Sequence, residues 1–222
     1  MEDITLVIPA KNEKESLPSV LDELSKYNIK KIVVLEKSDV QTIDAIKHYD
    51  LRILFQIKKG YGAALIEGIE SVETKYFAIF NADGSFDPNE LKLMFEKITN
   101  ENADLVFGTR YEVGCGSDDD NFITSVGNFI FTKIGKIFFK LNLTDILYTY
   151  VLGKTKLVNN LKIKNYDFSY CIALPITAKR NNLKLCNSKS FERKRIGGKK
   201  KVNAFKDGIL ILLSMIKLFF KN

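Results

Sequence analysis

Apolar residues follow two different patterns along the first half of the chain. Short runs rich in apolar residues predict strands, and these are residues 4–9, 31–35, 51–57, 76–80 and 103–108. Apolar residues at three- and four-residue spacing predict helices, and these are residues 16–27, 40–48, 62–72 and 88–98. Strands that alternate with helices form βαβ units. The first half therefore predicts an α/β fold with a mainly parallel, Rossmann-like sheet flanked by helices.

The second half of the chain is less regular. Residues 121–141 carry apolar side chains at helical spacing, whereas residues 170–176 and 183–191 fit either strands or mixed segments. The last segment predicts an amphipathic helix with an apolar face of Ile209, Leu212, Leu213, Ile216 and Phe220. A helix that closes the core and a basic helix lying in a membrane interface both show this periodicity. We expect one domain over residues 1–205, followed by a C-terminal amphipathic helix over residues 206–222.

The charge of the chain favours an anionic partner. Its 222 residues, enough for one domain with a full core, include 34 lysines and arginines against 27 acidic residues, a net charge of +7. Phosphate groups, nucleic acids and acidic membranes all suit this balance. The basic residues concentrate in one late segment, residues 189–206, and no RNA- or DNA-binding motif is present. We therefore expect no nucleic-acid partner.

Three sequence features bear on the compartment. The cysteines, Cys115, Cys171 and Cys186, lack metal-ligand spacing and leave one thiol over if two are paired, which favours a reducing compartment. No basic stretch stands ahead of an apolar run at the start, so no signal peptide is expected. The apolar run of residues 209–220 is broken by two polar residues and, at about 1.5 Å per residue, is shorter than a bilayer core of about 30 Å. We expect no spanning helix.

Polar side chains leave the end of the fourth predicted strand together. Asn81 and Asp83 stand at positions i and i+2, which point the same way on an extended strand end. Their oxygens suit Mg²⁺ or Mn²⁺, with diphosphate oxygens completing the shell. The alternative is a plain strand-to-helix turn, which we favour for Asp87 as the N-cap of a helix that begins at Pro88. Asp83 remains the candidate ligand, because the glycine and serine after it already supply the turn.

Polar residues also follow the ends of other predicted strands. Ligands of parallel sheets bind beyond the carboxyl ends of the strands. The residues that the pattern places along this rim are Asn12, Glu13, Glu36, Asp83 and Arg110. Because they follow different strands, we expect them to face one ligand site.

Residues 58–64 place two glycines, Gly60 and Gly62, at the start of a predicted helix. Glycines there let the backbone approach a phosphate, and a helix N-terminus favours negative charge. The segment is not a P-loop, because the Gly-Lys-Ser/Thr ending is missing, and the first strand carries no GxGxxG dinucleotide fingerprint. The segment therefore indicates a phosphate-bearing ligand held in another way.

Taken in order, these segments resemble glycosyltransferase family 2. The matching stretches are VIPAKNE (7–13), KGYGAAL (59–65), NADG (81–84) and ADLVFGTRY (103–111). The later stretches VGN (126–128) and ERKRIGGK (192–199) resemble its branch of dolichyl- or polyprenyl-phosphate sugar transferases, similar to dolichol-phosphate mannose synthase. The resemblance covers nearly the whole chain.

The resemblance implies a GT-A fold and inverting transfer of a sugar from a UDP- or GDP-linked donor to polyprenyl (dolichyl) phosphate. The donor-binding residues that it implies are Pro9, Ala10, Asn12, Glu13, Glu36, Lys59, Gly60, Gly62, Ala82 and Asp83. The implied ligands of Mg²⁺ or Mn²⁺ are Asn81, Asp83 and Ser85. The implied catalytic residues are Asp83 and Arg110, and the implied phosphate clamp is Arg110, Arg193, Arg195 and Lys199.

The chain departs from the family pattern at three places. Asn81 replaces the first aspartate of the metal motif, so one formal negative charge is lost. Leu35-Glu36 stands where the family usually has an acidic pair after the second strand. Residues 171–174 hold no acid, although relatives carry one there that is often discussed as the catalytic base. A lipid phosphate, largely ionised at neutral pH because its second pKa is about 6, suits that absence better than a sugar hydroxyl. A saccharide-hydroxyl transferase and a non-catalytic nucleotide-sugar-binding homologue remain the alternatives.

The late basic run has two interpretations. It either clamps phosphates in the active site or forms a patch that binds anionic lipids. Together with the amphipathic C-terminal helix, it predicts a membrane surface as a partner besides the nucleotide sugar and the polyprenyl phosphate lipid. We expect a cytoplasmic protein that is peripheral at the cytoplasmic face of a membrane.

Overall fold

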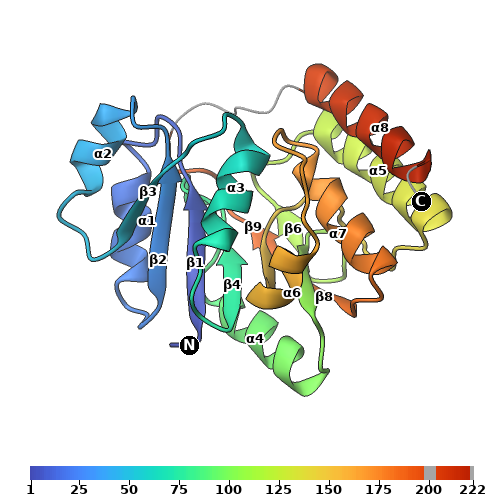
Figure 1. Ribbon diagram of the computed structural model, residues 1–222, viewed down its shortest axis with the longest axis horizontal. Helices are drawn as coiled ribbons and strands as arrows, with labels where there is room; N and C mark the ends of the chain where they lie inside the picture. Colours follow the sequence, from blue (N-terminus) through green and yellow to red (C-terminus); the bar gives the residue numbers. More distant parts are fainter. Residues whose placement is uncertain (198–203, 221–222) are drawn as a thin grey trace.

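The computed structural model describes residues 1–197 and 204–220 (Figure 1). The strands of its main sheet are β1 (Ile4–Pro9), β2 (Lys30–Leu35), β3 (Arg52–Phe55), β4 (Tyr76–Ile79), β5 (Leu105–Thr109), β7 (Val151–Lys154) and β8 (Leu185–Lys189). A small second sheet pairs β6 (Gly116–Ser117) with β9 (Phe191–Glu192). The helices are α1 (Leu17–Leu24), α2 (Val40–Ile46), α3 (Tyr61–Glu70), α4 (Glu90–Asn100), α5 (Phe122–Phe139), α6 (Thr155–Asn160), α7 (Tyr170–Arg180) and α8 (Ala204–Phe220).

The main sheet is parallel except at one strand. Its order is β3-β2-β1-β4-β7-β5-β8. β1 pairs with β2 and β4, β2 with β3, and β5 with β8, all in parallel. β7 lies between β4 and β5 and runs antiparallel to both. The mainly parallel α/β sheet predicted from the first half of the sequence is thereby confirmed.

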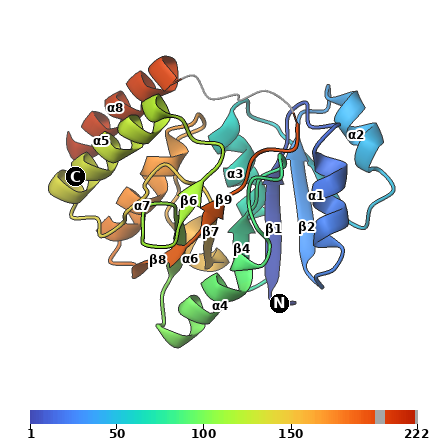
Figure 2. The ribbon, with the colours of Figure 1, turned by 180° about the vertical axis from the view of Figure 1, so that it is seen from behind.

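Helices bury both faces of the sheet, as Figures 1 and 2 show from opposite sides. Ile4, Leu6 and Ile8 of β1 join a cluster with α1, α2 and α4, whereas Val7 joins a cluster with α3, α6 and α7. Each such side chain withdrawn from water stabilises the fold by about 1.5–3 kcal/mol. Burial on both faces explains why the central strands are rich in apolar residues in the sequence.

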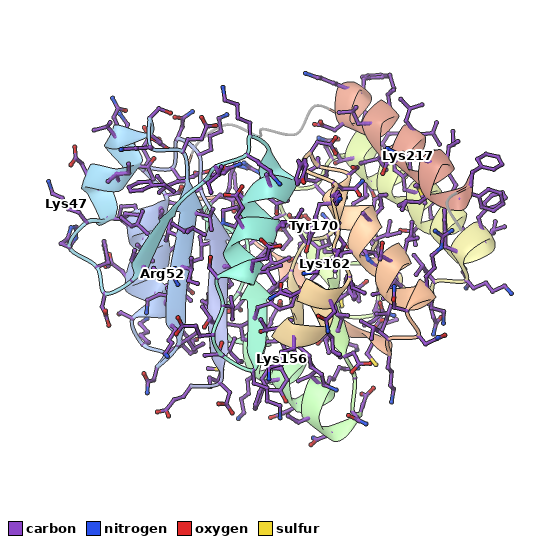
Figure 3. The ribbon with its side chains drawn as sticks, viewed as in Figure 1. Lys47, Arg52, Lys156, Lys162, Tyr170 and Lys217 are labelled. Carbon is purple, nitrogen blue, oxygen red and sulfur yellow. The ribbon has the colours of Figure 1, made fainter. Side chains whose placement is uncertain are left out.

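The segment over residues 170–176 is helical, so its interpretation as a strand or mixed segment is wrong. It begins α7, whose residues are buried on nearly every side against α3, α5, α8 and the sheet. A helix buried all round loses the alternation of apolar and polar residues that identifies most helices. Tyr170, labelled in Figure 3, marks its start. The region over residues 183–191 does contain strands, β8 and the first residue of β9.

Two details of the first half also differ from expectation. Helix α4 begins at Glu90 with Asn89 as N-cap, so the prediction of Asp87 as N-cap and Pro88 as first helical residue is wrong. The Asp87 carboxylate instead accepts a hydrogen bond from the Asn89 backbone N–H at 2.9 Å and closes the turn ahead of the helix. Strand β7 and helix α6 had no predicted counterpart, because each has at most six residues.

Helices α5 and α8 lie side by side at the end of the molecule away from α2 (Figures 1 and 2). Ile211 and Met215 of α8 are buried against α5 and α7. The apolar face predicted for the last helix, by contrast, is exposed. Among the helices of residues 1–197 and 204–220, α5 is long and apolar enough to cross a membrane, judged by length and composition alone. The sequence pattern did not predict this property of α5.

Candidate active site

The β4 turn (residues 81–85) brings the predicted metal-binding side chains together directly after β4. Asn81 Nδ2 donates a hydrogen bond to Ser85 Oγ at 3.2 Å, and Asp83 Oδ1 accepts one from the Ser85 backbone N–H at 3.1 Å. Gly84 between them has a φ of 85°, which side-chain-bearing residues rarely adopt, so the turn closes tightly. The turn therefore places one carboxylate and one amide at the rim of the sheet, with the buried Ser85 hydroxyl beneath them.

A strap (residues 191–197) crosses this turn from the end of β8. The Arg193 backbone N–H donates to the Ser85 carbonyl and the Ile196 N–H donates to the Asp83 carbonyl, both at 2.8 Å. The Ile196 side chain covers Gly84 so closely that a Cβ there would lie 2.5 Å from it. Backbone pairing thus fixes the strap over the turn.

Arg195 on the strap faces the carboxylate of Asp83. Its Nη2 lies 3.6 Å from Asp83 Oδ2, and its Nε and Nη2 donate to the two Asp119 oxygens at 3.0 and 2.7 Å. The hydrogen bond to Asp119 raises the pKa of Arg195, burial opposes this, and the charges of Asp83 and Glu13 add to the rise. Arg195 is therefore a permanent cation beside the β4 turn.

Arg193, a predicted member of the phosphate clamp, has a different position. It forms a two-pronged ion pair with Glu23 of α1 at 2.8 and 2.9 Å. Its guanidinium also donates to the Phe86 carbonyl. Arg193 therefore ties the strap to α1 and to the loop after β4. Lys199, another predicted member of the clamp, lies outside the described residues.

The predicted nucleotide rim follows β1 and β2. The Ala10 N–H, one residue after Pro9, donates to the Val34 carbonyl at 2.9 Å, and the Asn12 N–H donates to Asp39 Oδ2 at 2.7 Å. Glu13 is buried and its carboxylate accepts the Ser16 hydroxyl at 2.6 Å. Glu36 pairs with Lys11 at 3.2 Å.

The two glycines at the start of α3 let another part of the chain's backbone approach closely. A Cβ on Gly60 would lie 2.2 Å from the Tyr166 carbonyl oxygen, and one on Gly62 would lie 2.2 Å from that of Asn165. The Ala63 N–H also donates to the Tyr166 carbonyl at 2.9 Å. The backbone that approaches these glycines is the chain's own, at residues 165–167. These glycines therefore have a packing role, their part in binding a phosphate stays a prediction, and Lys59 beside them is exposed.

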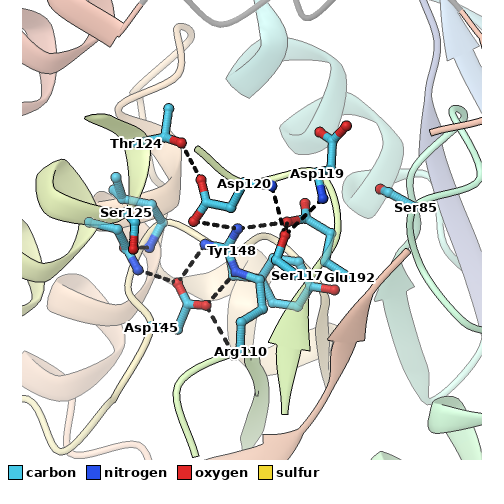
Figure 4. Close-up of polar contacts among 12 residues, drawn as sticks. Ser85, Arg110, Ser117, Asp119, Asp120, Thr124, Ser125, Asp145, Tyr148 and Glu192 are labelled. Atoms are coloured by element: carbon cyan, nitrogen blue, oxygen red, sulfur yellow. Dashed lines mark hydrogen bonds and ion pairs between the residues drawn. The ribbon is translucent and has the colours of Figure 1, made fainter. Parts of the chain in front are cut away.

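Arg110 after β5 is enclosed by acidic side chains (Figure 4). Its Nε lies 2.7 Å from Asp145, its Nη1 lies 2.8 Å from Glu192, and Nη1 lies 3.7 Å from Asp120. Its guanidinium also stacks over the Tyr148 ring at 4.6 Å. Burial lowers the pKa of Arg110, but the charges of Asp145 and Glu192 outweigh burial and raise it above its ordinary value. Arg110 is thus already neutralised by protein carboxylates.

A cavity of about 330 Å³ opens in front of Arg110. It is lined by Arg110, Tyr111, Gly116, Ser117, Asp120, Asn121, Phe122 and Ser125. These residues come from the loop after β5 and from the start of α5. The cavity offers hydroxyls, a carboxylate and aromatic rings to a second ligand beside the β4 turn.

Hydrogen bonds connect this cavity to the β4 turn. Asp119, the partner of Arg195, donates its N–H to Ser117 Oγ at 3.2 Å, and Ser117 in turn donates to Glu192, the partner of Arg110. Asn128 of α5 donates to Asp145 Oδ1 at 2.7 Å, which ties the predicted Val-Gly-Asn segment to the same network. Asp83 and Arg110, predicted as catalytic, thus belong to one connected site.

Sequence reasoning missed four residues of this site. They are Ser117, Asp119, Asp120 and Asp145. The run Asp118-Asp119-Asp120 in a basic chain was an available signal, whereas nothing marked the single Asp145. The residues at 171–174 lie inside α7, where burial raises the pKa of the Cys171 thiol.

The side chains of the β4 turn offer oxygen ligands to a divalent cation, with a single negative charge, that of Asp83. Within residues 1–197 and 204–220, no group of three or more His, Cys, Asp or Glu side chains is placed to hold a metal ion. The oxygens of Asn81, Asp83 and Ser85 are nevertheless the ligand types that Mg²⁺ and Mn²⁺ prefer. Diphosphate oxygens would complete the shell, and the bound ion would stabilise charge on the leaving group.

Known proteins share the sequence pattern of this chain. An uncharacterized glycosyltransferase of Mycobacterium tuberculosis is 32% identical over 110 residues, which are 50% of this chain and 50% of that relative. The chain therefore spans about half the length of that relative. The UDP-N-acetylglucosamine–dolichyl-phosphate N-acetylglucosaminyltransferase of Methanococcus voltae is 23% identical over 208 residues, which cover 82% of each protein.

The fold and the family follow from two further matches. Glucosyl-3-phosphoglycerate synthase from Mycobacterium tuberculosis, solved with Mn²⁺, UDP and glucosyl-3-phosphoglycerate, superposes with a TM-score of 0.76 at 17% identity. That match covers 96% of this chain and 79% of the synthase, so the GT-A-like α/β fold is confirmed. The model of the family described as Glycosyl transferase family 2 matches residues 5–205. The chain belongs to glycosyl transferase family 2.

Proposed function

We propose that this protein transfers a sugar from a UDP- or GDP-linked donor to polyprenyl phosphate at the cytoplasmic face of a membrane, with inversion at the anomeric carbon. In this reaction a phosphate oxygen of the lipid attacks the anomeric carbon. The bond from that carbon to the nucleoside diphosphate breaks, and the diphosphate leaves with the electron pair. An ionised phosphate needs no base to remove a proton. The acid absent from residues 171–174 is then not required.

One observation carries this proposal: a large apolar face on α5 and α8 remains exposed beside the cavity. We call this the α5/α8 face. On α5 it consists of Phe122, Ile123, Val126, Phe129, Ile130, Ile137 and Phe138. On α8 it consists of Phe205, Ile209, Leu212, Leu213, Ile216, Phe219 and Phe220. Soluble monomers rarely expose a contiguous apolar patch this large.

The α5/α8 face has the properties of a surface that lies on a membrane. The Phe138 and Phe219 rings meet at 5.7 Å, so the two helices form one surface. Exposed lysines, including Lys133, Lys136 and Lys217, accompany it, and Lys217 is labelled in Figure 3. Basic amphipathic helices of this kind bind in the plane of anionic membranes.

Phe122 lies where the α5/α8 face meets the cavity in front of Arg110. Phe122 belongs to the α5/α8 face, is 83% exposed and also lines the cavity in front of Arg110. A lipid whose chain follows that face would therefore bring its head group to the cavity. The dolichyl-phosphate substrate named for the Methanococcus voltae relative supports the same class of acceptor.

The test is a transfer assay with defined acceptors. Purified protein is incubated with UDP- and GDP-sugars, Mn²⁺ and vesicles that contain or lack a short polyprenyl phosphate. The proposal predicts a glycosylated lipid phosphate with inverted configuration, formed only with the lipid present. Retained nucleotide binding without any turnover would instead identify a non-catalytic homologue.

A second acceptor class, a saccharide hydroxyl, is favoured by the surroundings of Arg110. One guanidinium there meets three carboxylates, Asp120, Asp145 and Glu192, so a phosphate dianion would be repelled unless one of them moved away. Asp120 lines the cavity and could accept a proton from a hydroxyl. Transfer to a neutral glycolipid but not to polyprenyl phosphate, abolished by Asp120→Asn, would establish this class.

A further inference from the structure

The single carboxylate of the β4 turn already has a cationic neighbour. Arg195 Nη2 lies 3.6 Å from Asp83 Oδ2, on the side of the carboxylate that does not accept the Ser85 N–H. The side chains of Asp83 and Arg195 are only 14% and 22% exposed. Water therefore screens their attraction less than it would at an open surface.

The position of this cation is built into the backbone. The residue after Arg195 donates its N–H to the Asp83 carbonyl at 2.8 Å and packs its side chain on Gly84. Asp119 also fixes the guanidinium with two hydrogen bonds, one of them from the same Nη2 that faces Asp83. Arg195 is consequently held at the turn and is not a loose side chain on a basic tail.

A metal ion bound at Asp83 would have to share the carboxylate with this guanidinium. Carboxylate ligands lie about 2.0–2.1 Å from Mg²⁺, so an ion on Asp83 would sit within a few ångströms of a fixed positive charge. Asn81 supplies no compensating charge. Binding of the ion alone is then opposed by repulsion.

We propose that Arg195 and a divalent cation compete for Asp83 in the nucleotide-free protein, and that the donor diphosphate ends the competition by taking Arg195 as its own partner. Guanidinium groups bind phosphate oxygens in a two-pronged geometry, so the diphosphate offers Arg195 a partner equivalent to Asp119. The proposal rests on the nucleotide-sugar donor proposed above. Asp119 acts as a positioning residue that keeps Arg195 at the turn until the donor arrives.

Two consequences of opposite sign follow for a variant without this charge. Removal of Arg195 strengthens Mn²⁺ binding when no nucleotide is present, because the competitor is gone. The same change weakens nucleotide binding when no metal is present, because the diphosphate loses its protein cation. A general loss of folding or of positive charge would not change the two affinities in opposite directions.

The experiment compares the wild-type protein with Arg195→Gln and with a matched control, Lys194→Gln. Lys194 is the exposed neighbour on the same strap, so its variant loses the same charge without touching Asp83. Mn²⁺ binding without nucleotide is measured by electron paramagnetic resonance. Binding of UDP and of GDP in EDTA is measured by titration calorimetry. Thermal unfolding verifies that each variant is folded.

For Arg195→Gln we expect about tenfold tighter Mn²⁺ binding and about tenfold weaker nucleotide binding in EDTA, the lower end of the effect of a charge at this range. Lys194→Gln should leave both affinities unchanged. Unchanged Mn²⁺ affinity in Arg195→Gln overturns the competition, and unchanged nucleotide affinity overturns the transfer of Arg195 to the diphosphate.

Failure of the proposed function would give a different result. If neither UDP nor GDP binds to the wild-type protein with or without Mn²⁺, the proposed donor class is wrong, while the Mn²⁺ titrations still decide the competition. Absence of sugar transfer does not affect either binding measurement. The two proposals therefore fail in separate experiments.

Discussion

The two charged centres of the site, Asp83 and Arg110, are neutralised in opposite ways. Arg110 is a cation with a 9% exposed side chain, and it is held by carboxylates that include the fully buried Asp145. Asp83 is an anion whose cationic neighbour lies on the strap, a segment of the periphery. A charge enclosed by fixed opposite charges works as a structural element. A charge whose partner lies on a peripheral segment can exchange that partner for a ligand. Under the proposal that Arg195 leaves Asp83 for the donor diphosphate, the Asp83 side of the site exchanges its partner and the Arg110 side keeps its own.

The strongest way to break this comparison is to remove the buried anchor of Arg110. We expect Asp145→Ala to lower the free energy of unfolding by about 3–5 kcal/mol, because a buried cation is left without its main partner. Asp120→Ala, which removes a carboxylate 3.7 Å away, should cost much less. Urea unfolding measures both. Equal losses of unfolding free energy in the two variants would show that Asp145 is not the main anchor of Arg110.

A change at Asp83 should affect activity and not stability. We expect Asp83→Asn to reduce sugar transfer by roughly 10²–10³-fold, the usual effect of removing one electrostatic contact to a transition state. Its free energy of unfolding should change by no more than about 1 kcal/mol, because the amide oxygen can still accept the Ser85 N–H and Asp119 still holds Arg195. The matched control is Asp87→Asn in the same loop, where an amide oxygen can still accept the Asn89 N–H. Normal transfer by Asp83→Asn would refute its metal and diphosphate role.

If Asp83 exchanges Arg195 for a ligand, the surrounding backbone must stay rigid, and two glycines test that rigidity. Gly60 combines a φ of 118° with a virtual Cβ 2.2 Å from the Tyr166 carbonyl oxygen, so we expect Gly60→Ala to destabilise the protein by about 1–3 kcal/mol. Gly127 in α5 has no atom within 4 Å of its virtual Cβ. Gly127→Ala should raise stability by up to about 1 kcal/mol through helix propensity. Thermal unfolding of both variants separates strain from a general effect of added methyl groups.

The last expected effect concerns the membrane, the partner proposed for the Arg110 side of the site. We expect Leu213→Ser to weaken binding to anionic vesicles by about tenfold, since a half-exposed leucine loses part of its burial in lipid. Val113→Ser, at a 91% exposed residue that belongs to neither α5 nor α8, should bind like the wild type. Vesicle co-sedimentation measures both. Unchanged binding of Leu213→Ser would rule out α8 as part of the membrane surface.

The sequence predicted the regular parts of the fold because their burial is regular. The strands β1, β2 and β4 are buried over most of their length and give runs rich in apolar residues. Helix α7 is buried all round and gave no helical pattern, and β7 has only four residues. The apolar periodicity of α8 was correct, yet its buried contacts are made by Ile211 and Met215 beside the predicted face. Periodicity identifies a face but does not decide whether protein or lipid covers it.

The candidate site was only partly predictable for a related reason. Asp83 and Arg110 follow consecutive strands of the parallel series, so topology alone places them on one rim. Asp119 and Asp145 reach the site from the loops before α5 and β7, and their role depends on pairing across 76 and 35 residues of chain. Local pattern carries no information about such pairs. For the same reason the sequence did not reveal that the glycines of α3 lie against the backbone of residues 165–167.

The antiparallel strand β7 sets the width of the site. Because β7 is inserted between β4 and β5, the ends of those two strands are separated by two strand spacings, about 9–10 Å. The hydrogen-bond ladder fixes this distance, and changes in the surrounding loops leave it the same. Its amino end also brings the Tyr148 ring beneath the guanidinium of Arg110. The strand therefore holds the β4 turn and Arg110 at a fixed separation, and in the reaction proposed above this separation would keep the diphosphate and the acceptor one sugar ring apart.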